Sequence, residues 1–166
     1  TYREFEEISS RQFVEIIHQG HMPTSSQPAI GEVAALYEEF SGDEILNIAM
    51  AAGLSGTFQS ANIAKEMVEY EGIYIVDTKT VTHLIGALAR YADKLRSEGL
   101  SAAGIVEKVQ SVREKQVVYA GLQTLEYLYK GGRLSRTSAA VGSIANIKPI
   151  ITINTEGKVD SFAKAI

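Results

Sequence analysis

Hydrophobic positions along the chain follow two spacings, which predict helices separated by short strands. Apolar residues recur every three or four positions in segments that predict helices at about 10–19, 28–40, 57–70, 84–95, 102–112 and 124–130. Short β-branched runs predict strands at about 44–51, 73–76 and 116–121, and two further strands, 149–153 and 158–160, predict a hairpin. Ser9 and Gln12 have the spacing of a capping box before the first helix, and Gly20 follows its last turn.

Alternating strands and helices predict βαβ units, so we expect a three-layer α/β/α domain with a mainly parallel sheet. The continuous apolar run at 73–76 suits a strand that is covered on both faces. The hairpin at the end of the chain differs from this pattern and predicts the first strands of a second α/β domain. We therefore divide the chain into residues 1–146, an α/β domain that is incomplete at its start, and residues 147–166, the truncated beginning of the second domain.

Composition narrows the possible functions. The chain has 166 residues, 45% of them hydrophobic, which is enough for a packed core. Its net charge of −4 argues against a nucleic-acid-binding surface. The absence of cysteine excludes disulfides and thiolate chemistry and fits a cytoplasmic protein. We expect no integral membrane segment, no signal peptide and, since the chain opens on Thr1 rather than Met, a start inside a longer protein.

The turn between the predicted strand 44–51 and the next helix is the first candidate binding site. Ligands of open α/β sheets bind at the carboxyl ends of strands, where turns lead into helices. This turn contains Ser55, Gly56 and Thr57, which offer hydroxyl groups, a close backbone approach and unpaired helix amides to an anion. The same residues are also typical of a simple helix cap, and the two roles are compatible.

A second group of hydroxyl side chains, Thr24, Ser25 and Ser26, precedes the helix that we expect to begin at Pro28. This group too can be a helix cap. If the two turns converge on one oxyanion, they form a binding site rather than a reactive one.

Reactive chemistry has little support in the sequence. We find no nucleophile elbow, HExxH, Walker A, EF-hand or complete GxGxxG pattern, and we expect no metal site and no catalytic residue. The alternative is an α/β enzyme, an acyl or phosphoryl transferase, with Ser55 as its nucleophile. Lys130, Arg133 and Arg136 lie close together and are typical of a solvated helix end, although Arg133 and Arg136 are also candidates for partner docking.

Four segments in this order resemble the DegV family of bacterial fatty-acid-binding proteins. They are PTSSQP at 23–28, LSGTFQSA at 54–61, VDTK at 76–79 and LEYLYKGGRLSR at 125–136, and the sequence NIKPI at 146–150 continues the match. The combination is specific and spans nearly the whole chain.

The resemblance implies a non-catalytic protein that binds one long-chain fatty acid between two α/β domains. It implies that Ser25 and Ser55 hold the carboxylate, supported by Thr24, Ser26, Gly56 and Thr57. It also implies a partner, a fatty acid kinase that makes an acyl phosphate for phospholipid synthesis, and it implies no cofactor beyond the bound lipid. Our guesses for residues that line the apolar tunnel are Ile30, Leu54, Ile144 and Ile147.

The chain also departs from the family pattern. The family's opening strand is absent, as is most of the second domain, which contributes a histidine to the carboxylate site. Ala51 and Ala52 stand where a pair of serines is common, and Ser25 stands in place of a threonine, which retains the hydroxyl group.

Overall fold

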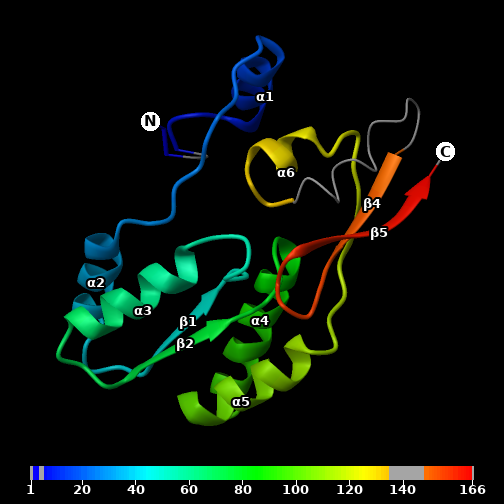
Figure 1. Cartoon of the computed structure of the whole chain (residues 1–166). Coiled ribbons are helices and arrows are strands. Elements are labelled where there is room, and N and C mark those ends of the chain that lie inside the picture. Colours follow the sequence, from blue (N-terminus) through cyan, green and yellow to red (C-terminus); the bar gives the residue numbers. More distant parts are fainter. Residues whose placement is uncertain (1, 4–5, 135–147, 166) are drawn as a thin grey trace.

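A computed structural model describes residues 2–3, 6–134 and 148–165 of the chain (Figure 1). In chain order its elements are α1 (Ser10–His18), α2 (Ile30–Glu39), β1 (Ile45–Ala49), α3 (Thr57–Met67), β2 (Ile73–Asp77), α4 (His83–Ser97), α5 (Ala102–Arg113), β3 (Tyr119–Gly121), α6 (Glu126–Lys130), β4 (Lys148–Ile153) and β5 (Val159–Ala165). The alternation of helices and strands that the hydrophobic pattern predicts is therefore confirmed.

The first layered unit is built around β1 and β2, which pair in parallel with Ile45 opposite Ile73. Helices α2 and α3 cover one face of this sheet and α4 and α5 cover the other (Figure 1). Side chains of β2 alternate between these layers, since Ile73 packs with α2 and α3 whereas Val76 packs with α4 and α5. The three-layer α/β/α prediction is confirmed for this unit.

The two faces of the parallel sheet differ in character. The face toward α4 and α5 carries a buried apolar cluster that includes Leu88 and Val109. On the opposite face Asn47 lies within the sheet and donates a hydrogen bond of 2.7 Å to the Tyr37 hydroxyl. Burial raises the pKa of Tyr37, and the hydrogen bond from Asn47 acts in the opposite direction. This bond satisfies a polar side chain that would otherwise destabilise the layer.

The second unit is an antiparallel sheet in the order β3-β4-β5. The predicted hairpin is confirmed, with Ile153 opposite Val159 and a register shift between Ile150 and Ile151. The strand expected at 116–121 differs from its prediction. It is shorter, and it pairs antiparallel with β4 instead of extending the parallel sheet. The proposed division at 146/147 lies outside the described residues and stays a prediction.

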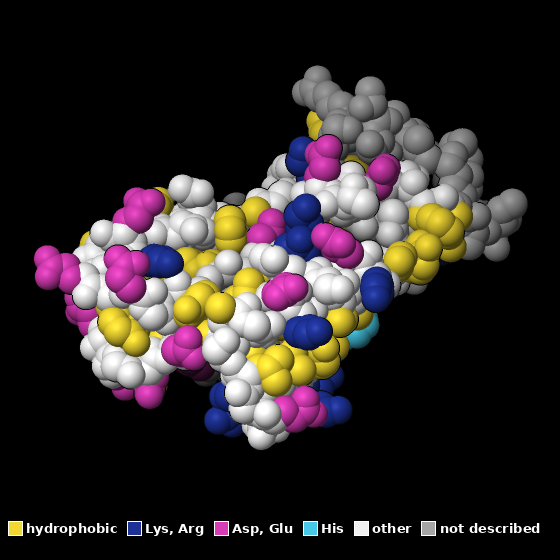
Figure 2. Space-filling model, turned by 90° about the horizontal axis from the view of Figure 1, so that it is seen from below, with side chains coloured by type: hydrophobic (Ala, Val, Ile, Leu, Met, Phe, Trp, Pro, Cys, Tyr) yellow, Lys and Arg dark blue, Asp and Glu magenta, His cyan; other side chains and the backbone are white. Residues whose placement is uncertain are grey.

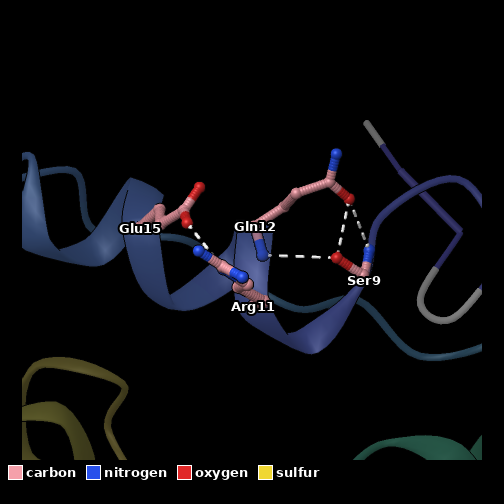
Figure 3. Close-up of polar contacts among 4 residues, drawn as sticks. All are labelled: Ser9, Arg11, Gln12 and Glu15. Carbon is pink, nitrogen blue, oxygen red and sulfur yellow. Dashed lines mark hydrogen bonds and ion pairs between the residues drawn. The ribbon is translucent and has the colours of Figure 1, made fainter.

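Helix α1 shows how local sequence fixes an element without burying it. Ser9 Oγ accepts a hydrogen bond from Gln12 N at 3.3 Å, and Gln12 Oε1 accepts one from Ser9 N at 2.9 Å (Figure 3). An Arg11–Glu15 ion pair lies along the same helix. The predicted capping box is thus confirmed. The predicted apolar face is not buried, because Phe13 and Val14 are 41% and 46% exposed.

The start of α2 also differs from its prediction. Pro28 lies two residues before the first helical residue, Ile30, instead of in the first turn. Residues 19–29 therefore form a connection without a helix or strand. This connection carries the hydroxyl side chains of residues 24–26 toward the rest of the molecule.

Candidate functional site

The turn after β1 is held in shape by its own backbone. The amides of Leu54 and Ser55 both donate to the carbonyl of Ala51, at 3.0 and 3.2 Å. Ser55 Oγ accepts a hydrogen bond of 3.2 Å from Thr57 N and lies 2.8 Å from Thr57 Oγ1. Ser55 therefore satisfies the first amide of α3 from the position before the N-cap residue, which is Gly56 and has no side chain to make a cap hydrogen bond. Its hydroxyl and that of Thr57 form one polar pair at the start of the helix.

The loop 24–28 lies directly against this turn. The side-chain amide of Gln27 occupies the space where a Cβ on Gly56 would be. Gly56 therefore leaves room for the Gln27 side chain at the helix start, which a Cβ at this position would displace. The predicted convergence of the two hydroxyl groups rests on this contact.

A pocket of about 370 Å³ opens beside the two turns. Ser25, Ser26, Ser55 and Thr57 form its polar side. Its remaining lining, apart from one arginine, is apolar and comes from the segments that follow β1 and β2, from α6 and from the second sheet: Met50, Leu54, Val81, Leu128, Ile151, Ile153 and Val159. The volume lies within the range of small-molecule pockets, about 300–1,000 Å³. A concave surface that is apolar except for hydroxyls at one side suits an amphipathic ligand with a polar head.

Arg133 lines the same pocket. Its Nε donates a hydrogen bond of 3.0 Å to the carbonyl oxygen of Leu54, and its Nη1 donates one of 2.6 Å to Gly131. The segment after α6 is thereby tied to the turn that carries Ser55. A guanidinium in the lining also supplies a positive charge to the pocket, which favours an anionic head group.

The carboxyl end of β2 supports the turn from the other side. Asp77 Oδ1 accepts hydrogen bonds from the amides of Ala52 and Lys79, at 3.2 and 2.9 Å. Arg113, from the end of α5, donates to the Asp77 carbonyl at 2.6 Å. Asp77 thus joins the two strand-end turns, which accounts for this carboxylate without a ligand of its own.

The predicted site residues divide into three groups. Ser25, Ser26, Ser55 and Thr57 line one pocket. Gly56 shapes the approach of the loop rather than the lining, and Thr24 is exposed and does not line the pocket. Arg136 lies outside the described residues. Of the guessed tunnel residues, Leu54 lines the pocket, Ile30 packs against the α2–α3 core, and Ile144 and Ile147 lie outside the described residues.

Sequence reasoning missed most of the apolar lining. Ile151 and Ile153 are two residues apart on β4, so strand alternation could have placed them on one face. Met50 and Val81 follow the ends of β1 and β2, where ligands of such sheets bind. The sequence pattern does not show that β4 and β5 face the first sheet across this pocket.

The chemistry of the site favours binding. The groups that bond to Ser55 Oγ are the Thr57 hydroxyl and backbone amide, and neither can act as a general base. Within residues 2–3, 6–134 and 148–165, no cluster of three or more His, Asp or Glu side chains could hold a metal ion.

No helix in the same part of the chain is long and apolar enough to cross a membrane. Figure 2 shows acidic and basic side chains interspersed on one face, with small apolar patches between them.

Comparison with known proteins gives one consistent result. A family model described as "Uncharacterised protein, DegV family" matches residues 1–166. The DegV domain-containing protein SAR1438 of Staphylococcus aureus is 35% identical over 156 residues, which cover 93% of this chain and 55% of that protein. The DegV domain-containing protein CA_C1624 of Clostridium acetobutylicum is 34% identical over 161 residues and is covered over 57% of its length. The chain thus spans somewhat more than half the length of these relatives.

Solved structures agree with this match. The fatty acid binding DegV family protein SAG1342 from Streptococcus agalactiae superposes with a TM-score of 0.88 at 32% identity, over 99% of this chain and 60% of that one. DegV from Bacillus subtilis, described as a fatty acid binding protein, gives 0.85 at 34% identity with the same coverage.

Proposed function

Because the chain belongs to the DegV family, we propose that it binds a long-chain fatty acid non-covalently and holds its carboxylate on Ser25 and Ser55. The observation that carries this proposal is the pocket that is lined by the hydroxyl turns and by apolar side chains of the segments after β1 and β2, of α6 and of the second sheet. Ser26 and Thr57 line the same polar side, while Thr24 and Gly56 act as supporters of the two turns. The solved relatives from S. agalactiae and B. subtilis are fatty acid binding proteins, which supports the same ligand class.

The head of such a ligand needs compensation for the water it leaves behind. Hydroxyl donors and a nearby cation stabilise a partly buried carboxylate, and charge-assisted hydrogen bonds are the stronger kind. Arg133, which the sequence offers as part of a solvated helix end or as a docking residue, also lines the pocket and adds a positive charge to the predicted hydroxyls. We therefore extend the proposed head-group site to include Arg133.

The tail would bind by burial of its methylene groups. Each buried CH₂ contributes about 0.8 kcal/mol, so a few methylenes against the apolar wall outweigh the cost of a modest head-group site. The wall on the second-sheet side consists of aliphatic side chains that set no direction for a hydrogen bond. We propose that the turns orient the carboxylate of the fatty acid and that the apolar wall supplies the affinity.

The proposal includes a partner, a fatty acid kinase that phosphorylates the bound carboxylate for phospholipid synthesis. The family resemblance supports this step. We propose that it takes place in the cytoplasm, where a kinase has access to ATP. A surface that docks the kinase must leave the carboxylate reachable. The proposed docking residues are Arg133, which lines the pocket, and Arg136, which lies outside the described residues. Since Arg133 lines the pocket, Arg136→Glu is the cleaner test of docking: we expect retained lipid and lost acyl phosphate formation.

Native mass spectrometry tests the proposed ligand. Full-length protein purified from bacteria is expected to carry one additional mass equal to a fatty acid, and denaturation should release this mass completely. Release on denaturation follows from non-covalent binding. The alternative function, a transferase with Ser55 as nucleophile, predicts instead an acyl or phosphoryl adduct that stays on the Ser55 peptide after denaturation. Protein without any associated acyl chain, which also fails to take up added palmitic acid, would contradict the proposal.

A further inference from the structure

The turn between β4 and β5 packs onto the strand-end turns of the first sheet. Gly157, in this turn, is buried although it belongs to a tight connection between two strands. A Cβ on Gly157 would lie 3.2 Å from the Cβ of Ala51 and 3.3 Å from the Cα of Lys79. The hairpin backbone therefore contacts the turns that follow both β1 and β2.

Gly53 is the residue that lets this contact be so close. A Cβ built on Gly53 would lie 2.7 Å from the carbonyl oxygen of Gly157 and 2.9 Å from Cγ of Lys158. Contacts below 3.0 Å are not tolerated, and a backbone oxygen cannot rotate away as the end of a side chain can. The φ angle of Gly53 is not positive, so alanine could adopt its backbone conformation. The close approach of the hairpin is thus the reason that this position needs a glycine.

The hairpin turn is held together by its own hydrogen bonds. Asn154 Oδ1 accepts hydrogen bonds of 3.0 Å from the amides of both Glu156 and Lys158, and Gly157 N donates to the Asn154 carbonyl at 2.9 Å. A residue that pushes Gly157 outward therefore displaces the ends of the two strands and not the loop alone. Those strand ends carry Ile153 and Val159, which line the pocket.

We infer that Gly53 is a positioning residue that sets the distance between the second sheet and the Ser55 turn, and thereby determines which acyl chains the pocket accepts. This inference rests on the proposed fatty acid binding. Gly53 does not line the pocket, so its effect passes through the hairpin. The hydrogen bond from Arg133 to the Leu54 carbonyl holds the Ser55 turn at another point of the pocket. A larger residue at position 53 therefore displaces the hairpin and widens the pocket on the hairpin side. A wider pocket accommodates a bent chain better than the native one does.

The test compares Gly53→Ala and Gly53→Val with the control Gly121→Ala in full-length protein. Gly121 is a glycine of β3 whose added Cβ would meet no heavy atom within 4 Å and whose φ is not positive. Delipidated protein is offered equal amounts of stearic acid, which is straight, and oleic acid, which is bent, and native mass spectrometry gives the ratio of the two complexes. For Gly53→Ala we expect this ratio to shift toward oleic acid by about fourfold, the factor for burial of one more methylene group. Gly53→Val should shift it further, and Gly121→Ala should not shift it.

A second measurement reports the contact without any ligand. The nuclear Overhauser effect between the Gly157 α-protons and the Ala51 methyl group should be strong in the wild-type protein and weak in Gly53→Ala. Equal loss of both acids without a change of ratio would show a merely structural role and overturn the inference, as would an unchanged Overhauser effect. Failure of the wild-type protein to bind either acid would instead contradict the proposed function, and the Overhauser effect would still decide whether residue 53 sets the spacing.

Discussion

Replacing Ser25 and Ser55 together by alanine is expected to weaken fatty acid binding by about a hundredfold or more, since two hydrogen bonds to a charged group are lost at about 1.5–3 kcal/mol each. Both side chains line the polar side of the pocket. The apolar wall remains intact in this variant, so the tail still contributes its burial. Isothermal titration calorimetry of the full-length protein with palmitic acid measures the change in Kd.

The chain offers a matched control for this double substitution. Ser9 and Ser101 each accept a backbone amide hydrogen bond at the start of a helix, as Ser55 does, but neither lines the pocket. Ser9→Ala with Ser101→Ala should lower stability through the loss of two caps, about 1 kcal/mol each, and should leave the Kd for palmitic acid unchanged. Equal Kd values in the two double variants would contradict the assignment of Ser25 and Ser55 as the head-group site.

The largest expected effect on stability comes from the core between the parallel sheet and helices α4 and α5. Leu88 is 1% exposed and packs in the buried cluster with Val76 and Val109. Leu88→Ala removes buried methylene groups and leaves a cavity, so the free energy of unfolding should fall by about 2–5 kcal/mol. Urea denaturation followed by circular dichroism gives this value from the transition midpoint.

Leu36 provides the comparison for Leu88. It lies on α2 and is 54% exposed, so Leu36→Ala should change the free energy of unfolding by no more than about 0.5 kcal/mol. Similar midpoints for the two variants would mean that the layer between the sheet and helices α4 and α5 does not contribute as its burial indicates.

Features that depend on neighbouring residues could be predicted from the sequence. The capping box of Ser9 and Gln12 needs only residues three apart, and the structure contains both of its hydrogen bonds. The parallel pairing of β1 and β2 followed from their apolar composition and the helix between them. These predictions succeeded because short-range spacing determines the interactions involved.

Features that depend on distant segments could not be predicted in the same way. The strand 119–121 looks like any other strand after a helix, and only its pairing with β4 shows that it belongs to the second sheet. The exposed face of α1 has the spacing of a buried one, and burial depends on a partner that a helical pattern does not specify. Local pattern fixes the kind of element, whereas the contacts between elements depend on the whole chain.

The candidate site divides along the same line. Ser55 and its cap were visible in the sequence, as were Ser25 and Ser26. The role of Arg133 in the pocket was not visible, because its hydrogen bond to Leu54 joins residues 79 positions apart. The contact of Gly53 with Gly157 is longer in range still, and the sequence showed only two glycines in two turns.

A crystal structure of the full-length protein with bound palmitic acid is the most direct test of whether the hydroxyl turns hold the carboxylate. We expect a carboxylate oxygen within about 3.2 Å of Ser55 Oγ, with the acyl chain along the wall that includes Leu54 and Ile153. A carboxylate that lies away from the hydroxyl turns, with the tail methyl group beside Ser55 instead, would contradict it.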